Sequence, residues 1–72
     1  MSEGEALVTQ LGVIEGELLT YVEEHGATPI RRLIRESEWP MPMVTMALGA
    51  LAREGLVRLI RHDLETIVEQ VR

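Results

Sequence analysis

One stretch of fifteen residues, residues 41–55, constrains the fold more than any other part of the chain. Its apolar residues recur at the spacing of one helical face: Val44, Ala47, Leu48, Leu51 and Ala52. Pro40 and Pro42 flank the start, where a missing backbone N–H costs nothing, and Gly55 stands where a left-handed C-cap is expected. The stretch is therefore predicted to be a helix with one buried face.

Two further helical patterns precede this stretch. Residues 7–25 carry an apolar stripe and predict a long first helix, after a lead-in over residues 1–6. Residues 30–36 predict a two-turn helix with Thr28 as its N-cap and Pro29 at its first position. We expect Val44, Leu48 and Leu51 to be buried against the stripes of these two helices, which consist of Ile14, Leu18, Val22, Leu33 and Ile34.

Gly12 and Gly16 lie four residues apart inside the first helical pattern. Each glycine destabilises a helix by about 1 kcal/mol relative to alanine. Either another helix or strand approaches closely at this point, or the helix begins only near Val13 and Gly12 belongs to a turn. Trp39, just before the third helix, is expected to fill the joint between the second and third helices.

The hydrophobic period changes after Gly55. Residues 56–61 and 66–71 read as two strands joined by a tight turn. In that register Leu59 lies opposite Val68, Ile60 opposite Ile67, and Arg58 opposite Glu69 as a cross-strand ion pair. A short terminal helix over residues 64–71 is the alternative, with Asp63 as its N-cap. Three consecutive β-branched residues, at positions 66–68, favour the hairpin.

These elements predict a mainly α fold with a small β-hairpin, which is a winged helix-turn-helix of three helices plus a wing. Residues 1–10 would form the lead-in and the start of the first helix, and residues 11–72 the domain. Three segments, Leu11-Gly12…Gly16…Leu18, Ile30…Leu33 and MALGALAREG at residues 46–55, resemble a family of short prokaryotic winged helix-turn-helix domains of unknown function. The resemblance implies the fold and a loose association with DNA-binding regulators, and no ligand or active residue. Residues 39–42, WPMP, depart from it, because polar helix-starting residues are expected there.

Composition excludes several classes of function. The 72 residues include no cysteine, so neither a disulfide nor a thiolate metal site is expected. No apolar run approaches the roughly 20 residues that span a bilayer, and the acidic start is no secretory signal, so we expect a cytoplasmic protein without a membrane partner. His25 and His62 are far apart, and the chain has no phosphate-binding loop, no nucleophile beside a base and no pair of buried-looking carboxylates. We expect no enzyme, cofactor, metal or small-molecule substrate.

The net charge of −5 is unevenly distributed. Residues 1–24 hold six glutamates and no base, whereas residues 25–72 hold seven arginines and six acids. An acidic protein is repelled by phosphate at long range, so nucleic-acid binding would need a local basic patch. The candidates for it are Arg31, Arg32, Arg35, Arg53 and Arg61. Ion pairing with the surplus glutamates is the other explanation for these arginines.

The outer face of the third helix is the candidate contact surface. It consists of Met43, Met46, Gly49, Ala50 and Arg53. Only the arginine offers the bidentate hydrogen bonding that base readout requires, and a small, flexible, apolar face suits packing against protein. We therefore expect a non-enzymatic binding module of the regulator type, acting through protein contact or as a homodimer. A DNA-binding transcriptional regulator that uses the third helix and the wing is the alternative.

Overall fold

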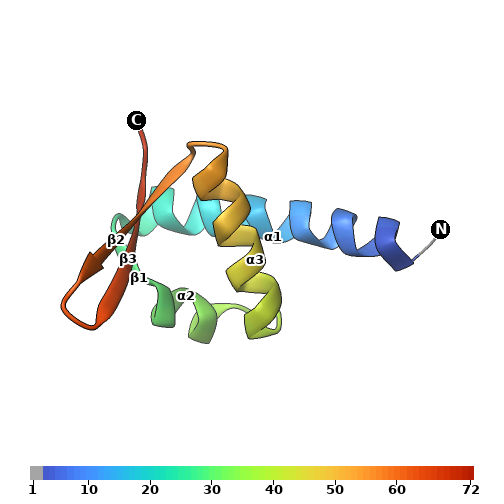
Figure 1. The fold of residues 1–72 in the computed structure, drawn as a ribbon, viewed down its shortest axis with the longest axis horizontal. Helices are drawn as coiled ribbons and strands as arrows, with labels where there is room; N and C mark the ends of the chain where they lie inside the picture. The colour runs from blue at the N-terminus through green and yellow to red at the C-terminus, as the bar shows by residue number, and fades with distance from the viewer. Residues whose placement is uncertain (1–2) are drawn as a thin grey trace.

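The computed structural model describes residues 3–72, and side chains from residue 7 onward. These residues form three helices and a small antiparallel three-stranded sheet (Figure 1). The elements are α1 (Glu3–His25), β1 (Thr28–Pro29), α2 (Ile30–Glu36), α3 (Met41–Arg53), β2 (Val57–His62) and β3 (Glu65–Gln70). The fold is mainly helical and is compatible with a winged helix.

The start of each of the first two helices differs from its prediction. α1 begins at Glu3, so residues 3–6 of the expected lead-in are helical, and residues 1–2 lie outside the described part of the chain. The N-cap of α2 is Pro29 and not Thr28. Thr28 lies in β1, where pairing with β3 holds its backbone extended, and its hydroxyl donates a hydrogen bond to the carbonyl of Gly26 at 2.8 Å.

The end of α3 confirms the expected glycine cap. Gly55 has a φ of +78°, a conformation that costs an L-residue about 1–2 kcal/mol. The Leu56 N–H bonds the Leu51 carbonyl at 2.9 Å, and the Gly55 N–H bonds the Ala52 carbonyl at 3.1 Å. These two hydrogen bonds form a Schellman motif, which turns the chain from α3 directly into β2.

The hairpin is confirmed in its register. β2 and β3 pair antiparallel with Leu59 opposite Val68, Ile60 opposite Ile67 and Arg58 opposite Glu69. Asp63 begins the two-residue turn with a φ of +56°. The alternative of a helix over residues 64–71 is therefore wrong. The short β1 adds a third strand on the other side of β3, which gives the order β1-β3-β2.

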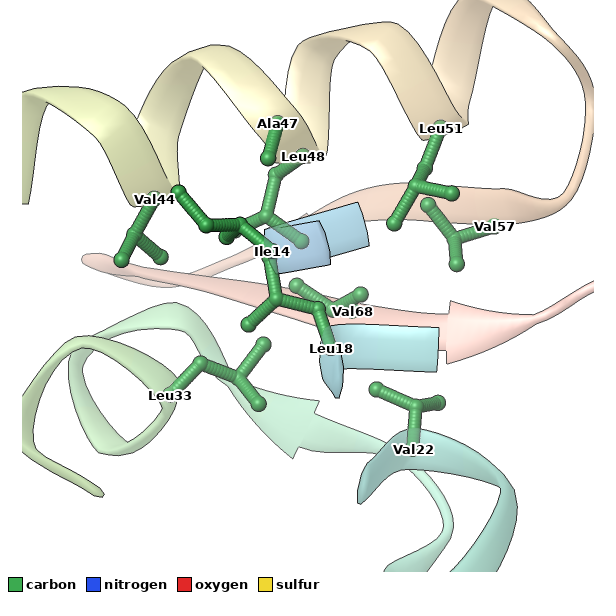
Figure 2. Packing of buried hydrophobic residues seen from close by; sticks show 10 residues of the cluster. All are labelled: Ile14, Leu18, Val22, Leu33, Val44, Ala47, Leu48, Leu51, Val57 and Val68. Carbon is green, nitrogen blue, oxygen red and sulfur yellow. The ribbon is translucent and has the colours of Figure 1, made fainter. Parts of the chain in front are cut away.

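One apolar core lies between the three helices and the sheet, where the ten buried side chains point toward one another (Figure 2). The expected core positions are buried, except Ile34, which is half-buried and packs against the cluster. Val57 and Val68 from the hairpin complete the core. The full set is Ile14, Leu18, Val22, Leu33, Val44, Ala47, Leu48, Leu51, Val57 and Val68.

The two glycines of α1 fit neither explanation offered for them. The helix runs continuously through Gly12 and Gly16, so neither belongs to a turn. Beyond the glycines' own helix and chain neighbours, no described atom lies within 4 Å of where a Cβ would stand on either. Close approach within this chain is therefore wrong as well, and both glycines border an open, shallow depression with Val13, Glu17 and Thr20.

Candidate functional site

The outer surface of α3 lies opposite its buried stripe. Met46 is 47% exposed, and Arg53 is exposed in the last turn of the helix. Gly49 and Ala50 are half-buried. Met43 does not belong to this surface, because its side chain is half-buried and packs against the core. The other four of the five residues expected on the outer face are at least partly exposed and lie outside the core cluster.

The structure adds the start of α3 to this surface. Met41 is 59% exposed, Pro42 is exposed, and the Thr45 hydroxyl donates a hydrogen bond to the Met41 carbonyl at 2.9 Å. Helical spacing alone places Met41 near the buried stripe, but the core contacts α3 only from Met43 onward. We use the name "α3 outer surface" for Met41, Pro42, Thr45, Met46, Gly49, Ala50 and Arg53.

The α3 outer surface carries almost no charge. Residues 39–52 form a run of fourteen residues without an acid, a base or a histidine. The Thr45 hydroxyl already donates its hydrogen bond within the helix. Arg53 is therefore the only side chain of this surface with donors for a base edge, whereas the methionines offer flexible apolar area.

The candidate arginines do not form one free basic patch. Arg31 forms an ion pair with Glu65, Arg35 lies 4.0 Å from Glu36, and Arg58 lies 3.0 Å from Glu69. Arg32, Arg53 and Arg61 show no ion pair among the described residues. Ion pairing thus accounts for some of these arginines. Their partners lie on α2 and β3, and not among the described glutamates of α1.

The Arg31–Glu65 ion pair ties α2 to the turn end of the hairpin. Arg61 lies opposite Thr66 at the same end, one residue from that pair. Arg31, Arg32 and Arg61 therefore belong to one end of the molecule. Arg53 is the last residue of α3 and comes just before the start of β2, whereas Arg61 lies near the end of that strand (Figure 1). The length of β2 therefore separates the two arginines.

A pair of carboxylates, which the sequence did not indicate, lies where α1 meets the end of α3. Partial burial of Glu15 raises its pKa, and the negative charge and hydrogen bond of Glu54 raise it further. Glu15 is half-buried and Glu54 is exposed, so the two carboxylates do not form a buried pair. The pairing depends on how the two helices cross, because the residues lie 39 positions apart in the sequence.

A pocket of about 180 Å³ lies between α1 and α2. Its apolar lining comes from the core residues Ile14, Leu18 and Leu33, and its polar lining from Glu17, Tyr21, Glu36 and Ser37. Trp39 is half-buried against the core beside it, and its indole N–H donates to the Glu17 carboxylate at 3.2 Å. Trp39 thus packs against the core and contacts α1 through this hydrogen bond.

The two histidines lie apart, at the C-terminal ends of α1 and β2. His25 stacks on Tyr21 with ring centroids 4.0 Å apart, and His62 lies 3.7 Å from Asp63 at the exposed hairpin turn. Across the described residues, no three of the His, Cys, Asp and Glu side chains are grouped closely enough to hold a metal ion. Nor does any helix of the described chain have the length and apolar character to cross a membrane.

Comparisons with protein-family models, with curated proteins and with solved structures find no match to this chain.

Proposed function

We propose that this chain is a winged helix-turn-helix module that acts by binding another protein molecule, through the α3 outer surface, and performs no catalysis. The element order α1-β1-α2-α3-β2-β3, with the sheet order β1-β3-β2, supports the winged-helix assignment. It makes α3 the helix that would present its exposed side to a partner, with β2 and β3 as the wing. The resemblance to short prokaryotic winged helix-turn-helix domains points the same way.

One observation carries the proposal: α3 leaves Met41 and Met46 about half exposed on a helix whose only charged residue is Arg53, in its last turn. Apolar area that stays in water in the monomer becomes favourable once a partner covers it, at about 25 cal/mol per Å². Covering this surface removes no ionised group from water except Arg53, whose long side chain can remain at the rim. A protein partner is therefore the occupant that the surface suits best.

A DNA-binding regulator is the second candidate. Arg32 and Arg61 favour it, because both are exposed, lack an ion pair within the described chain and belong to the end where α2 meets the hairpin. Arginines so placed can hold phosphates. The overall charge of −5 and the lack of base-reading side chains on α3 oppose it.

Two variants separate the candidates. Met46→Glu places a carboxylate at the centre of the α3 outer surface and should weaken any protein association there, because the charge must be desolvated without a partner. Leu64→Glu is the matched control, since Leu64 is 93% exposed at the hairpin turn. Oligomeric mass and stability are measured for both variants alongside the unaltered chain.

The DNA arm uses Arg32→Ala combined with Arg61→Ala. A regulator that binds DNA predicts tight binding to duplex DNA at near-physiological salt. In the double variant it predicts a loss of affinity and a salt slope that flattens by about one unit for each phosphate that the protein no longer neutralises. That result, with a chain that stays monomeric and is unaffected by Met46→Glu, would replace the proposed function by the second candidate.

A further inference from the structure

The pocket between α1 and α2 has an aliphatic floor and an acidic rim. Its floor is the side of the core formed by Ile14, Leu18 and Leu33, whose side chains lie beside one another in Figure 2. The exposed side chains of Glu17, from α1, and Glu36, from α2, form its rim. Among the described residues, no arginine or histidine lines it. We call this space the α1–α2 pocket.

Trp39 holds two polar groups of the α1–α2 pocket in position. Its indole N–H donates to Oε1 of Glu17 at 3.2 Å, and its backbone N–H donates to the Ser37 hydroxyl at 3.1 Å. The indole is half-buried against the core, so it restrains the Glu17 side chain. Oε2 of Glu17 has no partner within the described part of the chain. A carboxylate that is already oriented can accept a hydrogen bond from a ligand with little further loss of side-chain freedom.

Two further oxygen groups of the pocket are available to a ligand. Glu36 lies 4.0 Å from Arg35, and the two side chains are 53% and 60% exposed. Exposed ion pairs of this kind are weak, so the Glu36 carboxylate can bind another cation. The Tyr21 hydroxyl has no hydrogen-bond partner among the residues that the structure describes. Acceptor oxygens from Glu17, Glu36 and Tyr21 therefore surround one space.

We propose that the α1–α2 pocket binds a small primary amine, as an alkylammonium ion with a short aliphatic chain. An ammonium group has three N–H donors and no acceptor, which matches a rim of carboxylate and hydroxyl oxygens. Hydrogen bonds between an ammonium and a carboxylate are stronger than those between neutral groups. The chain contains no lysine, so none of its own side chains supplies this group. The aliphatic part of the ligand would lie on the floor of Ile14, Leu18 and Leu33.

The size and lining of the pocket define the ligand further. A water molecule takes up about 30 Å³ of the liquid, so the pocket of about 180 Å³ has room for about six groups of that size. n-Butylammonium is a molecule of this size. Quaternary ammonium ions are usually held by open aromatic faces, whereas Tyr21, the aromatic residue that lines the pocket, is stacked on His25. A metal ion is not favoured, because the described residues offer no group of three ligating side chains.

Trp39 makes binding observable, because it is the only tryptophan and its indole contacts Glu17. Titrating the full chain with n-butylammonium chloride should change the Trp39 fluorescence to saturation at millimolar concentrations, since so small a ligand binds weakly. The NMR amide shifts of Leu18, Tyr21 and Leu33 should change along the same curve. Sodium chloride at equal concentration corrects for ionic strength. 1-Butanol has nearly the same shape without the charge, and should bind about tenfold more weakly or less.

Glu36→Gln and Glu38→Gln form a matched pair of variants. Each removes one exposed carboxylate from the same short stretch, but only Glu36 lines the pocket. Glu36→Gln should raise the dissociation constant of n-butylammonium about fivefold or more, whereas Glu38→Gln should leave it within about twofold. Glu17→Gln should act like Glu36→Gln, and its amide oxygen can still accept the hydrogen bond from the Trp39 indole. The comparison corrects for the attraction that an acidic chain exerts on any cation.

Three results would overturn the inference: no saturable change with n-butylammonium, equal affinity for 1-butanol, or equal losses in the Glu36 and Glu38 variants. Tighter binding of N-acetyl-lysine amide would assign the pocket to a lysine of another protein, and would overturn a free amine as the ligand. This inference is independent of the proposed function, because the α1–α2 pocket and the α3 outer surface share no residue. Met46→Glu should therefore leave amine binding within about twofold, and either idea can fail without the other.

Discussion

The two faces of α3 have similar composition and opposite surroundings. Val44, Ala47, Leu48 and Leu51 on the inner face are at most 2% exposed, whereas Met41 and Met46 on the outer face are 59% and 47% exposed. Both faces are apolar and, up to Ala52, uncharged. The core of this small domain accounts for the inner face alone. The proposed function assigns the outer face to a partner, so substitutions on the two faces should have very different consequences.

The largest effect is expected on the inner face. Leu48→Ala should lower the free energy of unfolding by about 2–5 kcal/mol, because it removes a fully buried side chain and leaves a cavity among Ile14, Leu33 and the rest of the core. So small a domain has only about 5–15 kcal/mol in total, so the variant should be partly unfolded already at low urea concentrations. Urea denaturation measures the change. A loss below about 0.5 kcal/mol would mean that this face is not the core.

The second-largest loss of stability is expected just after the C-terminal end of α3, in the turn that leads into β2. Gly55→Ala should lower the free energy of unfolding by about 1–2 kcal/mol, because alanine is strained at a φ of +78°. No described atom outside the chain neighbours crowds the added methyl group, so the strain lies in the backbone alone. Thermal unfolding of the variant beside Gly55→Asn provides the control, since asparagine tolerates this conformation better. An equal loss in both variants would contradict the backbone explanation.

The sequence predicted what depends on local pattern. Helical spacing gave the inner face of α3, glycine and proline gave its ends, and alternation gave the hairpin with its register. Each of these follows from interactions between residues that are close in the chain or directly paired. Val57 and Val68 were missed as core residues, because a strand's buried side is decided by the helices that cover it and not by the strand itself.

The candidate site was predicted less completely, since its features depend on tertiary packing. Met43 is half-buried although its helical position is lateral, because it packs against the core cluster. Thr28 fails as an N-cap because pairing with β3 takes precedence over the cap. The Arg31–Glu65 and Glu15–Glu54 contacts each join elements more than thirty residues apart, and no local signal marks them.

A smaller effect is expected on the outer face. Met46→Ala should lower the free energy of unfolding of the monomer by at most about 1 kcal/mol, because about half of the methionine surface is already in water and alanine is the better helix former. Denaturation at low protein concentration, where partners are dissociated, measures this value. A loss as large as that of Leu48→Ala would show that Met46 stabilises the monomer, and would remove the reason for assigning its face to a partner.

The smallest effect, and the one of opposite sign, concerns Glu15 where α1 meets the end of α3. Burial and the nearby Glu54 raise the pKa of Glu15 in the folded chain above its ordinary value, so the folded state binds more protons than the unfolded state between these two values. The free energy of unfolding therefore falls as the pH rises through this window, and it stays lower at neutral pH. Glu15→Gln should stabilise the fold at neutral pH, and the gain should vanish as the pH falls below the ordinary pKa of a glutamate.

Glu23→Gln is the control variant. It removes the same charge at an exposed position of the same helix, and so corrects for the general repulsion in an acidic chain. Urea denaturation across pH measures both variants, and equal gains at every pH would show that the meeting of Glu15 with Glu54 has no effect of its own.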